Sequence, residues 1–162
     1  MTKPLADLLM NMDARDYFPR GLKQPENGFR FSVDSLLLAV FAKTPSKARI
    51  LDLGCGCGII GLNLLLDNPG CTLTGLDINP QMIDCANKNA AHLELAHRAV
   101  FAFSDVRHVL SETSMHQSFD LVVINPPYRE LESGKVPQRL DRKRARFQTN
   151  VALSDFLAAS SY

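Results

Sequence analysis

The chain has 162 residues, of which 46% are hydrophobic and 22% are charged, and its formal net charge is +1. This length is enough for one domain with a real core and too short for two. The balanced charge excludes a strongly basic or acidic chain, so any attraction to nucleic acid must come from a local cluster.

Features that bear on location indicate the cytoplasm. The first 21 residues lack the apolar segment and small-residue cleavage site of a signal peptide. No apolar run approaches the roughly 20 residues needed to cross a bilayer, so no membrane contact is expected. Of the four cysteines, Cys71 and Cys85 fall within a predicted strand and helix and Cys55 and Cys57 within a glycine-rich loop between such elements, a distribution that favours reduced thiols over a disulfide scaffold. A zinc site built from Cys55, Cys57 and a histidine has poor spacing, so no metal is expected.

Apolar runs and helical patterns alternate along the chain. In chain order, we expect a helix over 35–41, a strand over 48–53, a helix over 59–66, a strand over 71–77, a helix from Pro80 to about His92 capped by Asn79, strands over 98–103 and 120–124, and an amphipathic stretch over 151–159. Continuous apolar strands separated by helices predict a parallel sheet covered on both faces, which is a doubly wound α/β fold. The single domain 1–162 divides into an arm (1–45), a core (46–128) and a basic loop with a terminal helix (129–162).

A glycine-rich loop joins the first strand to the first helix. It begins with Asp52 and contains Gly54, Gly56 and Gly58, which allow sharp turns and close approach of a ligand. The run from Gly56 to Gly61 also satisfies the dinucleotide fingerprint, with Asp77 placed to bind a ribose. A carboxylate at position 52 favours a cofactor that carries an amine over one that carries a pyrophosphate.

The loop resembles motif I of the class I S-adenosylmethionine-dependent methyltransferases. The resemblance implies that Asp77 binds the ribose and that Asp105 lies near the adenine amine. The residues that this implies for the cofactor site are Asp52, Gly54, Gly56, Gly58, Asp77, Ile78, Asp105 and Asn125.

The fourth strand ends at Asn125-Pro126-Pro127-Tyr128. The two prolines give the backbone one rigid shape, so the Asn125 side-chain carbonyl and the Pro126 carbonyl can accept both hydrogens of a planar NH₂ group. Its nitrogen lone pair is then free to attack a sulfonium methyl, and Tyr128 can stack on a flat base. This tetrapeptide resembles motif IV of the methyltransferases that modify adenine N6, guanine N2 or a glutamine amide, which implies that all four residues are catalytic.

The segment from Gly28 to Ala39 resembles the arm of the bacterial valine-tRNA adenine-N6 methyltransferases. In that family the arm packs beside the methionine end of the cofactor, although a capped helix with an apolar face explains the same residues equally well. After the fourth strand comes a basic cluster that can contact RNA phosphates. The predicted RNA-binding residues are Arg139, Arg142, Lys143, Arg144 and Arg146.

The resemblance implies an S-adenosylmethionine-dependent enzyme that methylates adenine N6 in the anticodon loop of a tRNA. The alternatives are a protein glutamine-N5 methyltransferase, an rRNA guanine-N2 methyltransferase, and an inactive fragment that binds cofactor or RNA. An NAD-dependent enzyme is a more distant alternative.

The family's sheet has seven strands in the order 3-2-1-4-5-7-6, and this sequence supplies four of them, without the C-terminal strands. We therefore expect an apolar edge at 121–124 that self-associates, is covered by 151–162, or continues into a longer parent chain. We also expect this 162-residue chain to have little or no methyl transfer activity, with cofactor binding surviving better than catalysis.

Overall fold

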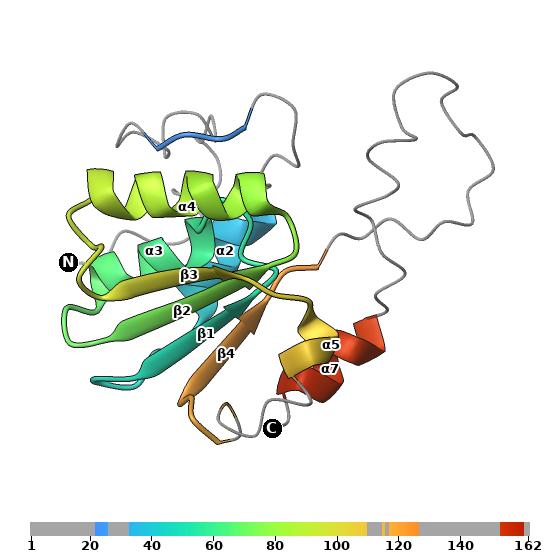
Figure 1. Ribbon diagram of the computed structural model, residues 1–162. Helices are drawn as coiled ribbons and strands as arrows, with labels where there is room; N and C mark the ends of the chain where they lie inside the picture. Colours follow the sequence, from blue (N-terminus) through green and yellow to red (C-terminus); the bar gives the residue numbers. More distant parts are fainter. Residues whose placement is uncertain (1–21, 26–32, 110–114, 116, 127–152, 161–162) are drawn as a thin grey trace.

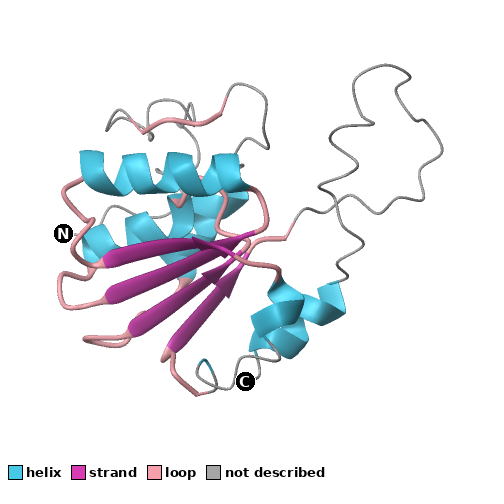
Figure 2. Cartoon of the chain, viewed as in Figure 1, coloured by secondary structure: helices cyan, strands magenta, loops and turns pink. Residues whose placement is uncertain are grey.

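The computed structural model describes residues 22–25, 33–109, 115, 117–126 and 153–160. Strands and helices alternate along these residues (Figure 2). In chain order, the elements are α2 (Val33–Phe41), β1 (Arg49–Leu53), α3 (Ile59–Asp67), β2 (Thr72–Asp77), α4 (Pro80–His92), β3 (Ala99–Phe103), α5 (Val106–Val109), β4 (Leu121–Ile124) and α7 (Leu153–Ser160).

The four strands form one parallel sheet in the order β3-β2-β1-β4. Helices α2, α3 and α4 lie on one face, and α5 and α7 lie on the other (Figure 1). The predicted doubly wound α/β fold and strand order are therefore confirmed. Because the strands are parallel, their carboxyl ends meet at one edge of the sheet, where ligands bind in folds of this kind.

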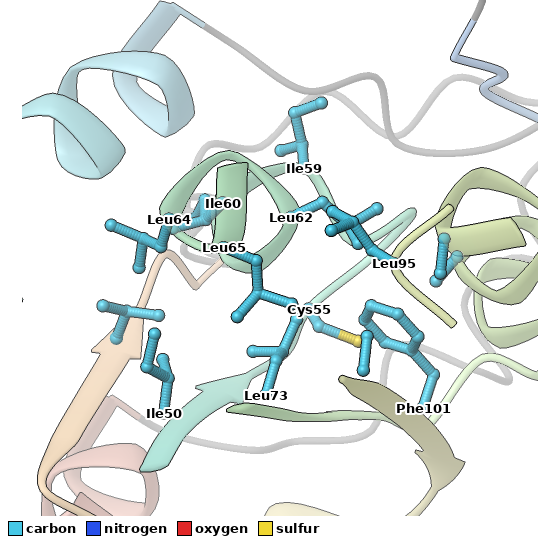
Figure 3. Packing of buried hydrophobic residues seen from close by; sticks show 14 of the residues in the cluster. Ile50, Cys55, Ile59, Ile60, Leu62, Leu64, Leu65, Leu73, Leu95 and Phe101 are labelled. Atoms are coloured by element: carbon cyan, nitrogen blue, oxygen red, sulfur yellow. The ribbon is translucent and has the colours of Figure 1, made fainter. Parts of the chain in front are cut away.

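Strand alternation divides the core into two clusters. Ile50, Leu73 and Phe101 point toward α3 and α4, where they are buried with the α3 side chains (Figure 3). Leu51 and Leu53 point to the other face and are buried with Phe156 of α7. Both faces of β1 are therefore buried, as its unbroken apolar sequence predicts.

Turns set the strand boundaries. Strands β1, β2 and β3 each begin one residue later than predicted. The N–H groups of Ala48, Cys71 and Arg98 donate to the carbonyls of Pro45, Asn68 and Leu95, so they close turns and do not join the ladder. Helix α4 begins as predicted, with the Asn79 side chain accepting from the Gln81 N–H at 3.0 Å and Pro80 in the first turn.

β1 is the neighbour of β4 within the described residues. Helix α7, predicted over 151–159 and observed from Leu153, packs against a face of the sheet through Phe156 and Ala159. It therefore covers a face of β4 and does not pair with its edge. The described helices include none that is both long and apolar enough to span a membrane.

Candidate active site

Backbone hydrogen bonds hold the glycine loop against β2. The N–H groups of Gly54 and Cys55 both donate to the Leu76 carbonyl, at 2.8 Å and 3.0 Å. Gly54, Gly56 and Gly58 all have positive φ, at 73°, 55° and 82°. The loop thus turns sharply between the end of β1 and the start of α3, as predicted.

Gly56 and Gly58 differ in what surrounds them. A Cβ placed on Gly58 would lie 2.9 Å from the Phe101 ring and 3.2 Å from the Ala86 methyl group, so packing alone excludes a side chain there. A Cβ on Gly56 would meet nothing within 4 Å. Gly56 therefore borders open space at the carboxyl edge of the sheet, where a ligand can approach the backbone closely.

Asp77 ends β2 and holds the loop from the other side. Its Oδ2 accepts from the Gly56 N–H at 2.9 Å, and its Oδ1 accepts from the Asn79 N–H at 2.8 Å. Burial raises the pKa of this carboxyl, although these backbone N–H groups oppose the shift. Each oxygen keeps a second lone pair, and both Asp77 and Ile78 are partly exposed, so the expected ribose contact fits the geometry.

Asp52 has a role that the sequence did not predict. Its side chain is fully buried, and its Oδ2 accepts from the Gly61 N–H of α3 at 3.1 Å. Its Oδ1 is also buried, with no hydrogen-bond partner among the described residues. Burial raises the pKa of Asp52 to about 7. Asp52 therefore ties β1 to α3, and its expected contact with the cofactor's amine stays a prediction.

The Asp105 carboxylate is hydrogen-bonded to the neighbouring Arg107. Its Oδ1 accepts from both the backbone N–H and Nε of Arg107, at 2.9 Å each, and Arg107 Nη2 bonds to its Oδ2. These contacts lower the pKa of Asp105, with the Arg107 side chain contributing most. The predicted contact with an adenine amine would share this carboxylate with Arg107.

Asn125 follows β4 beside the glycine loop. In the sheet register Leu53 lies opposite Ile124, so Gly54 and Asn125 are the residues that follow this pair at the carboxyl edge of the sheet. Asn125 Nδ2 donates to Ser35 Oγ of α2 at 2.8 Å. We call residues 125–128 the Asn125 corner, of which Asn125 and Pro126 are described. Pro127, Tyr128 and the basic residues from Arg139 to Arg146 lie outside the described residues.

The sequence did not predict three contacts of the site: Ser35 with Asn125, Gly61 with Asp52, and Arg107 with Asp105. Ser35 lies one turn before Ala39 on the buried side of α2, and a hydroxyl on such a face signals the need for a polar partner. Asp52 lies two residues after Ile50 in β1, so both side chains are on the face that α3 covers, and this spacing could have predicted the contact with Gly61. The partner of Ser35 had no signal in the sequence, because Asn125 lies 90 positions away.

These residues fit a nucleoside cofactor that carries an amine. The open space at Gly56 can admit it, and Asp77 has lone pairs available for hydroxyl groups beyond its two backbone bonds. A pyrophosphate near this acidic end of the sheet would meet unfavourable charge.

The sequence model of the methyltransferase small domain matches residues 32–146. The chain belongs to this family. The match includes α2, the glycine loop and the Asn125 corner, so this methyltransferase small domain carries every element from which the candidate site is built.

Two kinds of curated relative resemble this methyltransferase small domain. It is 31% identical over 131 residues to the release factor glutamine methyltransferase of Neisseria gonorrhoeae, covering 78% of the chain and 44% of the relative. It is 32% identical over 137 residues to the tRNA1(Val) (adenine(37)-N6)-methyltransferase of Porphyromonas gingivalis, covering 82% of the chain and 53% of the relative. The chain thus spans about half the length of these relatives.

Solved structures show the same fold. The protein PH1948 from Pyrococcus horikoshii superimposes with a TM-score of 0.57 at 18% identity, over 72% of this chain and 61% of that one. The Rossmann-like sheet predicted from the sequence is therefore confirmed.

Proposed function

We propose that this domain belongs to an S-adenosylmethionine-dependent N-methyltransferase that acts on a planar amino group, foremost adenine N6 of a tRNA. One observation carries the proposal: Leu53 pairs with Ile124 in the register of β1 and β4, so the glycine loop and Asn125 both begin at the same edge of the sheet. A loop suited to a nucleoside cofactor and an amide suited to hold an amine then share one edge.

Several described residues would hold the cofactor. Asp77 would bind the ribose hydroxyls while it keeps its contact with Gly56, and Ile78 would border the base. Asp105 would accept from the adenine amine alongside Arg107. When bound, this cofactor supplies a methyl group on a positively charged sulfur.

Asn125 and Pro126 would orient the acceptor nitrogen. The Asn125 side-chain carbonyl and the Pro126 carbonyl are acceptors, and together they can take both hydrogens of an NH₂ group. The nitrogen lone pair then points away from these carbonyls, and rate enhancement comes from positioning and aligned dipoles. Stacking of the base on Tyr128 remains part of the proposal.

The similarity to a tRNA-modifying enzyme and the basic residues from Lys135 to Arg146 support a tRNA substrate. The alignment with the Porphyromonas gingivalis tRNA enzyme extends over 137 residues. Six of the residues from Lys135 to Arg146 are basic and one is acidic, a composition that suits phosphate contacts. A target base must leave its stack to reach such a corner. The cytoplasmic location expected from the sequence goes with this substrate.

A glutamine side chain is the second candidate substrate, favoured by the similarity to the Neisseria gonorrhoeae release factor enzyme. Its amide presents the same planar NH₂ group, so the Asn125 corner suits it equally. Charge separates the two candidates, because only RNA binding should depend steeply on salt.

Mass spectrometry after single-turnover reactions tests this proposal. The chain is held in excess over substrate, with cofactor carrying a deuterated methyl group, so that slow transfer is still counted. Separate reactions contain unmodified bacterial tRNA and an unmethylated bacterial release factor. We expect labelled N6-methyladenosine in the tRNA reaction, lost with Asn125→Ala. Labelled glutamine alone would assign the second substrate. No label in either reaction would assign the inactive-fragment alternative and contradict methyl transfer by this chain.

Salt dependence supplies a second test of the RNA substrate. Affinity for a tRNA anticodon stem-loop should fall steeply as salt rises, and the triple change of Arg142, Lys143 and Arg144 to Ala should flatten that slope by about three phosphate contacts. The control changes Lys43 and Lys47 to Ala, outside the basic cluster. Equal slopes for the wild type and the triple variant would contradict RNA contact by these residues.

A further inference from the structure

The contact between Ser35 and Asn125 joins two segments that are distant in sequence. Asn125 Nδ2 donates to Ser35 Oγ at 2.8 Å, across 90 positions. Ser35 is 4% exposed, so water has little access to compete for this bond. Asn125 itself is only partly buried, which leaves part of its side chain open to a ligand.

We infer that Ser35 is a positioning residue that anchors the Asn125 side chain by its Nδ2, so that Oδ1 can face the substrate. The inference rests on the proposed function, in which Asn125 accepts a hydrogen from the substrate's NH₂ group. Ser35 does not touch the substrate in this account. It acts through Asn125.

The two ends of an asparagine amide have opposite hydrogen-bonding character. Oδ1 accepts and Nδ2 donates, and the two ends have nearly the same shape. With Nδ2 bonded to Ser35, Oδ1 is left as the acceptor for a substrate hydrogen. With the amide turned over, Nδ2 would face the substrate's own N–H groups, and two donors cannot bond each other. Selecting one orientation is therefore necessary for Asn125 to hold an amine.

Ser35 can anchor Nδ2 because α2 holds the serine in place. Helix α2 packs against α3, and Ala39, one turn after Ser35, is buried in the same cluster as the α3 side chains. Leu36 and Leu38 also pack against that cluster. The serine oxygen is thus held by a packed helix, and only a short side chain separates it from the backbone.

The contact also gives α2 a role in the chemistry. The sequence placed this helix in an arm beside the cofactor, whereas the structure brings it to the amine-binding residue. A helix that served packing alone could carry alanine at position 35, as it does at position 39. The hydroxyl therefore supplies something that packing does not require.

Nuclear magnetic resonance of the Asn125 side-chain NH₂ group tests the inference directly, in the full 162-residue chain. The signals are assigned by their disappearance in Asn125→Asp. The variants are Ser35→Ala, which removes the hydroxyl, and Ser35→Thr, which keeps it. Leu36→Ala is the matched control, because it loosens the same helix and leaves the hydroxyl intact.

In Ser35→Ala we expect the NH₂ signals to shift and their exchange with water to rise about two- to tenfold, the effect of one lost hydrogen bond. Single-turnover methyl transfer should fall about ten- to a hundredfold with cofactor affinity unchanged. Ser35→Thr should restore both quantities, and Leu36→Ala should lower stability without changing either.

Unchanged NH₂ exchange in Ser35→Ala would overturn the inference. Equal effects of Ser35→Ala and Leu36→Ala on exchange or transfer would also overturn it, because they would mean that the helix matters and the hydroxyl does not. A wild-type chain that transfers no methyl group would contradict the proposed function, and the exchange measurement would still decide the role of Ser35.

Discussion

The glycine loop and the Asn125 corner share one edge of the sheet, but different contacts hold them. The loop is fastened by backbone bonds to Leu76 and by the Asp77 carboxylate, and β1 has a paired strand on each side. The Asn125 corner follows β4, which pairs with β1 in the described part of the chain, and its side chain bonds to Ser35 of a separate helix. The proposed cofactor end is thus built into the sheet, whereas the proposed amine end depends on α2. Changes at the two ends should separate binding from catalysis.

The largest effect is expected at the amine end. Asn125→Ala should slow methyl transfer by about 10²–10³-fold, the usual loss when one oriented polar group is removed from a reacting centre. The melting temperature should change little, because Asn125 is partly buried and makes one described side-chain bond. Single-turnover rates and thermal unfolding measure the two quantities. A rate within threefold of the wild type, on the order of experimental scatter for such comparisons, would remove Asn125 from the mechanism.

Two glycines of the same loop sharpen the comparison. Gly58→Ala should reduce the free energy of unfolding by about 2–4 kcal/mol, since a methyl group there meets Phe101 and the backbone has positive φ. Gly56→Ala should cost about 1–2 kcal/mol, because only its backbone conformation resists the change.

Under conditions in which both variants are folded, Gly56→Ala should weaken cofactor binding more than Gly58→Ala does. Gly56→Ala places a methyl group in the open space at the sheet edge, so it should weaken binding directly. Urea unfolding and calorimetry distinguish the two variants. Equal loss of stability in both would show that Phe101 moves aside at little cost.

The buried Asp52 carboxyl should make stability depend on pH. Its pKa in the folded protein is about 7, raised from 3.8, so between these values the folded state holds a proton that the unfolded state has lost. The free energy of unfolding should therefore decrease as pH rises from about 4 to about 7.

Asp52→Asn should remove this part of the slope, because the amide is neutral and its oxygen can still accept from the Gly61 N–H. The free energy of unfolding of the variant should exceed that of the wild type by on the order of 1–3 kcal/mol between about pH 5 and pH 8. Asp77, whose raised pKa acts in the same direction, is present in both proteins and cancels in the difference. Parallel pH profiles would mean that Asp52 is ionised when the protein is folded.

A smaller effect is expected away from the site. Arg98 donates to the carbonyls of Leu65, Asn68 and Cys71, at 3.0–3.1 Å, where α3 ends and β2 begins. Arg98→Ala should lower the free energy of unfolding by about 1–3 kcal/mol and leave cofactor affinity unchanged. Arg49→Ala is the control, because its ion pair with Asp120 is exposed and should matter less. Weakened cofactor binding in Arg98→Ala would show that the two ends of the sheet are coupled.

Local patterns predicted most of the fold and the sharp turn of the glycine loop. Apolar runs marked the strands, and Asn79 with Pro80 marked the start of α4, because caps and strands depend on neighbouring residues. The glycine spacing likewise predicted the turn after β1. The sequence could not show which residues distant in the chain are in contact, or which neighbouring side chain occupies a predicted site residue. The bond from Asn125 to Ser35 requires the folded arrangement of α2 and β4, and the Arg107 guanidinium reaches Asp105 only in the side-chain conformation that the fold gives it.

Calorimetric titration with S-adenosylhomocysteine tests the central claim most directly. The account predicts one binding site on the wild-type chain, no heat with NAD, affinity reduced at least about tenfold by Asp77→Ala through the loss of charge-assisted hydrogen bonds, and a smaller reduction by Asn125→Ala. Preferential binding of NAD, or equal affinity of the wild type and Asp77→Ala for S-adenosylhomocysteine, would contradict it.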